Sequence, residues 1–384
     1  TAGELVGMSP RASPATGREP AADDARFMRR ALALAERGWG QVSPNPLVGA
    51  VVVRHGKVVG EGFHAAYGGD HAERAALGRA GGAARGATVY VTLEPCAHVG
   101  KTLPCAEALI EAGVQRVVIA TRDPNTVAAG GAEALRKAGI TVDIGIAEAE
   151  AREHNAAYFH ALASDRPWVT LKLAISIDGA VADHTRKTGW LTGVEARAEV
   201  HRLRAQHDAV GVGMGTVRAD DPALTVRDAK APRVPPLRVV FSRSGRLPLT
   251  SVLARTARDF PVLVMAQEPD SAYQTTLHSI GVELLQASSL GDALRELRKR
   301  DVRSLMVEGG ARLAGALLFD HLVDRLVVFT APVVLGSGAL NAFLLAPSQR
   351  AEQASRMPVV RRAMFGDDVM TVYAALPAAA DENR

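Results

Sequence analysis

Residues 93–105 read LEPCAHVGKTLPC, and this stretch decides how the first half of the chain is interpreted. It contains Cys96 and Cys105, the two cysteines of the 384-residue chain, and each directly follows a proline. Upstream, His71 and Glu73 stand in the triplet HAE. Thiolates with an imidazole suit Zn²⁺, and a catalytic zinc has three protein ligands and an open position for water. The pattern therefore predicts a metal site formed by His71, Cys96 and Cys105.

Glu73 separates a catalytic interpretation from a structural one. A carboxylate beside a metal that it does not bind can carry a proton to a leaving amine. A His-x-Glu element followed by Pro-Cys elements is the order found in zinc deaminases of nucleobases, although the eight-residue spacer here exceeds their usual close pair. Without Glu73, buried free cysteines or a short disulfide loop would explain the pattern about as well. With it, the sequence favours a hydrolytic deaminase.

Helical and strand patterns alternate around this motif. Helices are expected at 23–36, 71–79, 105–112, 131–138 and 147–163, and strands at 48–53, 57–60, 88–93, 116–121 and 140–144. Such alternation indicates an α/β layer fold with a largely parallel sheet. The strands at 48–53 and 57–60, separated by His55-Gly56, are expected to form a hairpin.

A polar stretch at 164–167 ends in proline and predicts a domain boundary. Beyond it, strands are expected at 168–177, 209–212, 237–241, 261–265, 282–285, 304–307 and 325–331, and helices at 195–206, 291–300 and 311–319. We therefore expect two unlike α/β domains, at 23–165 and 166–384. Residues 1–22, rich in Pro, Ala, Ser and Gly, are expected to form a flexible leader.

The composition is that of a soluble, folded protein. Hydrophobic residues make up 47%, and the net charge of +4 favours anionic ligands such as phosphorylated small molecules. Aromatic residues make up 4%, too few for the stacking surfaces of single-stranded nucleic-acid binders. The low cysteine content predicts a reducing cytosol, and no apolar stretch approaches the roughly 20 residues of a membrane span.

Four motifs together resemble one family. NPLVG at 45–49, GEGFH at 60–64, HAE at 71–73 and the 93–105 run are similar, in order, to the bifunctional riboflavin-biosynthesis deaminase/reductase, over nearly all of residues 23–375. The resemblance implies a cytidine-deaminase-like three-layer domain followed by a dihydrofolate-reductase-like α/β domain. The first would deaminate 2,5-diamino-6-(5-phosphoribosylamino)-pyrimidin-4(3H)-one with zinc. The second would use NADPH to reduce the ribosyl side chain to ribityl.

The resemblance also assigns residues in the first domain. It implies one zinc per chain on His71, Cys96 and Cys105, with Glu73 as the proton shuttle. Base, ribose or phosphate would be held by Asn45, His64, His98, Lys101, Asp123 and Asn125. Lys101 offers a charge for phosphate, and the asparagines offer paired donors and acceptors. Taken singly, Asn45 and Asn125 fit ordinary turn chemistry beside proline equally well.

Two glycine-containing turns stand out in the second half. VGVGMGT at 210–216 lacks the last glycine of the dinucleotide fingerprint, so a Rossmann interpretation fails. EGG at 308–310 ends a strand and opens a helix, where free N–H groups suit a pyrophosphate. Close packing of backbone alone would also explain both turns.

The resemblance assigns ligand contacts here as well. NADPH would be held by Ala174, Trp190, Thr216, Asp220, Ser242, Gly310, Ala311, Arg312, Leu313, Ala314, Gly315 and Ala316, and the phosphoribosyl substrate by Thr188, Arg204, Leu224, Arg227 and Glu308. The guanidinium forks of Arg204 and Arg227 match phosphate oxygens, and Ser242-Arg243 suits an adenosine 2′-phosphate. No catalytic acid is assigned, because the cofactor carries the hydride chemistry.

Two alternatives remain at this point. A deaminase of nucleic-acid bases would need basic stripes interleaved with aromatic residues. A non-catalytic zinc module joined to a nucleotide-binding domain would need a fourth protein ligand to close the metal site. The expected partners are a small phosphoribosyl pyrimidine and, by the resemblance, a second copy of the chain bound through the reductase domain, with no nucleic acid and no membrane.

Overall fold

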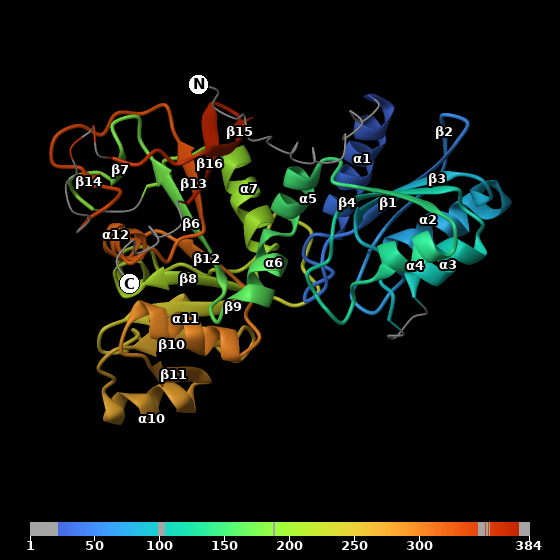
Figure 1. Ribbon diagram of the computed structural model, residues 1–384. Helices are drawn as coiled ribbons and strands as arrows, with labels where there is room; N and C mark the ends of the chain where they lie inside the picture. The colour runs from blue at the N-terminus through green and yellow to red at the C-terminus, as the bar shows by residue number, and fades with distance from the viewer. Residues whose placement is uncertain are drawn as a thin grey trace, which may run out of the picture.

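The computed structural model describes residues 22–98, 104–186, 189–344 and 354–375, together with Arg350 and Glu352. Lys101 and Thr188 lie outside the described residues, as does the expected leader except for Ala22. The described residues form two main sheets, one of five strands and one of nine, with a separate two-stranded pair beside the larger one (Figure 1).

The first sheet has the strand order β2-β1-β3-β4-β5. Its strands are β1 (Gly49–Arg54), β2 (Lys57–Phe63), β3 (Thr88–Leu93), β4 (Arg116–Thr121) and β5 (Thr141–Ile144). The expected hairpin is confirmed, since β1 and β2 pair antiparallel. β1 also pairs antiparallel with β3, whereas β3, β4 and β5 run parallel. The carboxyl ends of β3 and β4 therefore lie at one edge of this sheet.

Helices cover both faces of the first sheet. Alternate residues of a strand point to opposite faces, so Ala50 and Val52 pack beneath α2 (Ala72–Ala80), α3 (Cys105–Glu111) and α4 (Gly131–Lys137). Val51 and Val53 face the other side, where α1 (Ala22–Ala35) and α5 (Glu148–His154) pack. The expected three-layer domain is confirmed.

The second sheet has the order β11-β10-β9-β8-β12-β6-β13-β16-β15. Its parallel strands are β6 (Trp168–Ile175), β8 (Ala209–Gly213), β9 (Leu237–Ser242), β10 (Val262–Ala266), β11 (Val282–Gln286), β12 (Ser304–Glu308) and β13 (Arg325–Thr330). The antiparallel hairpin of β15 (Val359–Phe365) and β16 (Asp368–Ala374) extends it, and β7 (Ala180–Ala182) pairs with β14 (Leu340–Asn341) apart from it. The α/β expectation is confirmed.

Helices also cover both faces of this sheet. α11 (Leu290–Lys299) and α12 (Ala311–Phe319) pack on one face. α7 (Val194–Arg204), α8 (Met214–Asp220), α9 (Val252–Arg255) and α10 (Ser271–Ser279) pack on the other. Short 3₁₀ turns occur at η1 (Glu36–Gly38) and η2 (Gly81–Ala84). Among the described helices, none has the length and apolar character required to span a bilayer.

One expected helix is wrong in its continuity. Residues 147–163 form two helices, α5 and α6 (Ala156–Ala163), that are separated at Asn155. The buried Asn155 side chain accepts a hydrogen bond from the Leu47 N–H at 2.7 Å and donates one to the Leu47 carbonyl at 2.9 Å. This long-range pairing holds Asn155 outside helical geometry, and the apolar spacing of 147–163 carries no sign of it. Figure 1 shows α5 and α6 between the two main sheets.

Several elements of the second half were not expected from the sequence. These are β7, α8, α9, α10, β14, β15 and β16. Some are very short, such as the four residues of α9. β15 is mostly exposed and so lacks the alternation of apolar and polar residues that marks a half-buried strand.

Candidate zinc and cofactor sites

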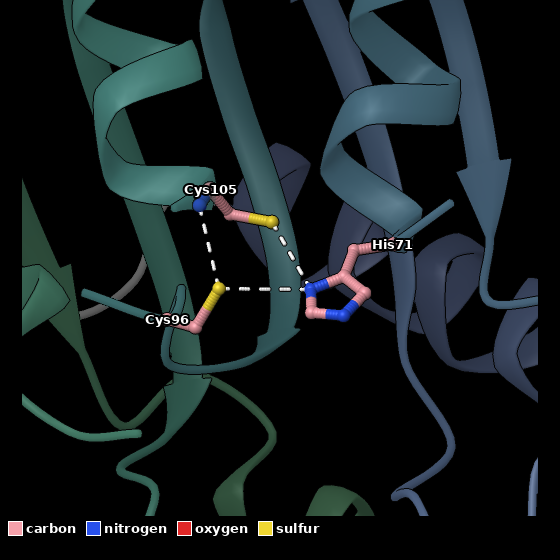
Figure 2. Close-up of side chains that lie close together, drawn as sticks. All are labelled: His71, Cys96 and Cys105. Carbon is pink, nitrogen blue, oxygen red and sulfur yellow. Dashed lines mark hydrogen bonds between the residues drawn. The ribbon is translucent and has the colours of Figure 1, made fainter. Parts of the chain in front are cut away.

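The three predicted metal ligands lie together at one edge of the first sheet (Figure 2). His71 directly precedes α2, Cys96 follows β3, and Cys105 begins α3. His71 Nδ1 lies 3.6 Å from Cys96 Sγ and 3.3 Å from Cys105 Sγ. All three ligand atoms lie within 4.8 Å of one another.

Two local features fix this geometry. A Cβ added to Gly62 in β2 would lie 2.2 Å from the Ala72 carbonyl oxygen, so only glycine lets the start of α2 approach the sheet this closely. The N–H of Cys105 donates to Cys96 Sγ at 3.3 Å (Figure 2). The first N–H groups of a helix favour the thiolate form of a cysteine that they contact.

The pKa shifts of the three side chains favour one thiolate, the form in which a cysteine binds a metal. The Cys105 thiol donates to Cys96 and, with His71, lowers the pKa of Cys96 to about 4, whereas burial opposes this shift. The same contact with Cys96 raises the pKa of Cys105. The hydrogen bond from His71 to Cys96 raises the pKa of His71. A cation bound between these three side chains would displace the protons that they share.

The distances fit zinc. Bonds of about 2.3 Å to sulfur and 2.0–2.1 Å to nitrogen in a tetrahedron separate sulfur and nitrogen by roughly 3.5 Å. The observed Nδ1–Sγ separations of 3.3 and 3.6 Å match that value. Both cysteines are free thiols, so the disulfide alternative is wrong. Among the described residues, the ligand group contains no fourth protein side chain.

Glu73 is buried beside the ligands without belonging to their group. It lies in the first turn of α2, and 3% of its surface is exposed. Burial raises its pKa, and the Cys105 side chain is a hydrogen-bonding neighbour. A raised pKa makes a buried carboxyl a better proton acceptor than an exposed one, which suits a group that passes protons.

Asn45 and His64 extend from the metal group toward the rest of the predicted substrate site. His64 Nδ1 lies 3.0 Å from the Asp70 carbonyl oxygen, and its Nε2 lies 3.1 Å from Asn45 Nδ2. The rings of His64 and His71 meet edge to face, with centroids 5.5 Å apart. Burial lowers the pKa of His64, which favours a neutral ring that accepts from Asn45.

Asp123 and Asn125 share one turn after β4. The Asn125 N–H donates to Asp123 Oδ1 at 2.9 Å, and the Tyr158 hydroxyl donates to the same oxygen at 3.2 Å. Burial raises the pKa of Asp123. His98 follows Cys96 in the same loop, and its buried Nδ1 has no hydrogen-bond partner among the described residues. A partner for that atom is therefore left to a ligand or to water.

Glu94 supports this turn and was not predicted as a site residue. Its buried carboxylate accepts backbone N–H groups from Asp123, Gly130 and Ala132 at 3.1–3.3 Å. The available signal was an acidic residue directly after a buried strand. Such a residue stays buried only where several donors meet it.

Several of the predicted cofactor residues lie at the carboxyl edge of the second sheet. Ala174 stands near the end of β6, Ser242 ends β9, and Thr216 lies in the first turn of α8. Gly310 precedes α12 with φ +83°, and a Cβ there would lie 3.0 Å from Thr216 Oγ1. The first turns of α8 and α12 are therefore neighbours, and residues 311–316 are the first six residues of α12.

Arg204 and Glu308, both predicted to bind substrate, bind each other. Arg204 Nη2 lies 2.8 Å from Glu308 Oε2, Arg204 Nε donates to Glu308 Oε1, and Nη1 donates to the Thr225 carbonyl at 2.9 Å. Burial opposes the shift, but this ion pair holds the pKa of Glu308 below its usual value. The fork of Arg204 expected for phosphate is thus engaged by a carboxylate.

Lys172 lies beside Glu308 and was not among the residues predicted from the sequence. It faces Glu308 in the pairing of β6 with β12, and burial lowers its pKa. A lysine inside a strand of otherwise mostly apolar residues was the available signal.

The remaining predicted residues differ in how much of their side chains is exposed to solvent. Arg227 is exposed, and its backbone N–H donates to His201 Nδ1 at 3.2 Å. The Leu224 side chain is buried at φ +54°, so only its backbone can face a ligand. Trp190 is 79% exposed, with the Arg197 guanidinium 5.0 Å from its ring centre. Asp220 is the last residue of α8.

Comparison with known proteins identifies both halves. Residues 21–121 match the cytidine and deoxycytidylate deaminase zinc-binding region, and residues 167–359 match the RibD C-terminal domain. The riboflavin biosynthesis protein RibD of Aquifex aeolicus is 43% identical over 82% of this chain and 88% of its own length. This chain belongs to the RibD family. RibD of Escherichia coli is 39% identical over 90% of this chain and 98% of its own length.

Solved RibD structures share the whole architecture. Acinetobacter baumannii RibD superposes with a TM-score of 0.79 at 38% identity, covering 92% of this chain and 99% of that one. A deaminase/reductase from Thermotoga maritima, named for diaminohydroxyphosphoribosylaminopyrimidine and 5-amino-6-(5-phosphoribosylamino)uracil, gives 0.79 at 36% identity with the same coverage.

The RibD family gives the chain its function. It is a bifunctional deaminase/reductase of riboflavin biosynthesis, with a zinc-binding deaminase domain followed by a dihydrofolate-reductase-like reductase domain. The two alternatives, a nucleic-acid base deaminase and a non-catalytic zinc module, are wrong. Zinc and an NADPH-type cofactor are the groups that these two domains imply.

Proposed function

We propose that this RibD chain deaminates 2,5-diamino-6-(5-phosphoribosylamino)-pyrimidin-4(3H)-one and then reduces the ribosyl group of the resulting aminouracil to ribityl with NADPH. The carrying observation is the group of His71, Cys96 and Cys105 with Glu73 buried against it. We also propose the domain limits 23–165 and 166–384. They are supported because the strands before α6 belong to the first sheet and β6, which follows α6, belongs to the second.

In the deaminase site, His71, Cys96 and Cys105 hold one zinc per chain. The ion, when bound, activates the water that attacks the amine-bearing ring carbon. Glu73 takes up a proton from that water and releases it to the leaving ammonia. Asn45 and His64 bind the base, while Lys101, His98 and the Asp123–Asn125 turn bind the ribose phosphate. The hydrogen-bonded contacts of Asn45, His64 and Asp123 support their part of this division.

In the reductase site, NADPH supplies the hydride, and the protein orients the two reactants. The adjacent first turns of α8 and α12 hold the cofactor pyrophosphate, and Ser242 meets the adenosine end. Arg227 and Thr188 hold the substrate phosphate. Arg204 keeps Glu308 ionised beside the ribose, and Lys172 is the neighbouring group that can give up a proton.

We also propose a reducing cytosolic location and a homo-oligomer formed through the reductase domain. The free thiols of Cys96 and Cys105 support the first. The exposed side chains of Val359, Val360 and Met364 on the edge strand β15 support the second, because uncovered apolar edges tend to pair.

The test supplies the diaminopyrimidine nucleotide and NADPH to purified protein. Ammonia and the loss of nicotinamide absorbance are followed together, and zinc is measured in the same sample. We expect both signals in equal final amounts and about one zinc per chain. Ammonia release without NADPH oxidation would refute the second step. Near-zero zinc in an active deaminase would refute the metal assignment.

A further inference from the structure

The segment between η1 and β1, here called the 39–47 loop, is fastened to the reductase domain. Ser43 Oγ donates to Asp208 Oδ1 at 2.8 Å, and Arg233 Nη2 donates to the Ser43 carbonyl at 2.6 Å. Ser43 thus meets one reductase-domain residue through its hydroxyl and another through its backbone. It stands two residues before Asn45, which contacts His64 in the deaminase site.

Further hydrogen bonds join the 39–47 loop to the reductase domain. Arg303 Nη1 donates to the Pro44 carbonyl at 3.0 Å. Gln41 Nε2 donates to the Ala231 carbonyl at 2.9 Å, and the N–H of Arg233 donates to the Gly40 carbonyl at 2.8 Å. Four residues of the 39–47 loop, Gly40, Gln41, Ser43 and Pro44, are therefore hydrogen-bonded to residues more than 160 positions away in the sequence.

A cavity of about 1020 Å³ lies at this loop and is lined by residues of both domains. Its wall includes Trp39, Gly40, Val42, Ser43, Pro44, Asn45 and Leu47. The buried side chains of Val42 and Leu47 pack within the deaminase domain, whereas the polar groups of Ser43 and Pro44 bond to the reductase domain. One end of the loop is fixed, since Asn155 pairs with Leu47 through both backbone groups.

Asp208 is itself held rigidly. Its Oδ2 accepts from the N–H groups of Arg303 and Ser304 and from the Ser304 hydroxyl, each at 3.0 Å. The Asp208 N–H donates back to Ser304 Oγ at 3.0 Å. These bonds tie the residue before β8 to the start of β12. The oxygen that meets Ser43 is therefore already oriented before the loop binds to it.

A short series of contacts leads from this point to the metal ligands. Ser43 is two residues from Asn45, Asn45 Nδ2 lies 3.1 Å from His64 Nε2, and the His64 ring packs against His71. We propose that Asp208 and Arg233, residues of the reductase domain, are positioning residues for deamination: by holding Ser43 they keep Asn45 in its base-binding position. This inference rests on the proposed role of Asn45.

The test uses full-length, zinc-loaded protein and the variants Ser43→Ala and Ser43→Thr. We expect Ser43→Ala to raise KM for the diaminopyrimidine nucleotide roughly tenfold, as loss of a hydrogen bond to a charged group does, with kcat changed less than about twofold. Ser43→Thr keeps a hydroxyl and should restore KM. Zinc content and NADPH oxidation with supplied aminouracil nucleotide should stay unchanged, and the unfolding temperature should fall by no more than a few degrees, the cost of one lost hydrogen bond.

A second variant and a control complete the design. Arg233→Ala removes the partner of the Ser43 carbonyl and should raise the same KM, again without affecting the reductase. Ser279→Ala removes a hydroxyl on α10 that bonds only within its own helix region at 2.7 Å, and it should change nothing.

Unchanged KM in both Ser43→Ala and Arg233→Ala would overturn the inference. So would a parallel loss of both activities with a lowered unfolding temperature, because that result indicates general destabilisation. A wild-type protein that releases no ammonia would instead overturn the proposed function, so the two failures are distinguishable.

Discussion

At the zinc group, side chains from a few short motifs touch one another, whereas at the carboxyl edge of the second sheet the assigned residues are spread over many strands. His71, Cys96 and Cys105 lie within 4.8 Å, with Glu73 buried beside them. In the reductase domain, Gly310 offers only backbone and Leu224 buries its side chain. The first site depends on the chemistry of individual groups, and the second depends more on the shape of the backbone.

Among substitutions that separate the two sites, Glu73→Gln should have the largest effect. The amide keeps the size of the side chain but cannot carry a proton, so ammonia release should fall by at least about 10²-fold with zinc retained. NADPH oxidation with supplied aminouracil nucleotide should be unaffected. Glu111→Gln, at the exposed end of α3, is the matched control. Near-normal ammonia release from Glu73→Gln would contradict the shuttle role.

Arg227→Ala tests a side-chain contact in the other site. If the guanidinium binds phosphate as proposed, its removal should raise the reductase KM for the nucleotide roughly tenfold and leave deamination intact. Steady-state NADPH oxidation measures the change. Arg255→Ala, an exposed arginine on α9, should have no effect. Loss of both activities would argue against separate sites.

Gly310→Ala tests the backbone-based part of the reductase site. A side chain at φ +83°, 3.0 Å from Thr216 Oγ1, is strained by about 1 kcal/mol. The free turn relieves this strain by moving its backbone N–H groups, and restoring them on binding should weaken NADPH binding about fivefold. Fluorescence titration with NADPH measures this, and Gly291→Ala on α11, where a Cβ makes only ordinary contacts, is the control. Tighter or equal NADPH binding by the Gly310→Ala protein would show that this turn does not hold the cofactor.

The sequence was sufficient to predict features that depend on short, local patterns of residues. The zinc ligands stand in short motifs next to regular elements, so their spacing was enough to bring His71, Cys96 and Cys105 together. Most strands were also found, because apolar strands flanked by turns are distinctive.

The parts that were missed depend on contacts between distant residues. The helix break at Asn155 follows from Leu47, and the engagement of Arg204 follows from Glu308. Neither pairing leaves a periodic trace in the sequence. Residues that act by position, such as Glu94, are recognised only when the backbone groups that they hold are known.

The two domains meet at the amino ends of strands of the second sheet, on the side away from the proposed reductase site. Asp208, Arg303 and Arg325 contact the first domain or its connecting helices from the amino ends of their strands, while Ser242 and Glu308 stand at the opposite ends. Even a five-residue strand such as β12 spans roughly 16 Å. The surface of the reductase domain that contacts the first domain is therefore opposite the sheet edge at which the proposed cofactor and substrate residues lie.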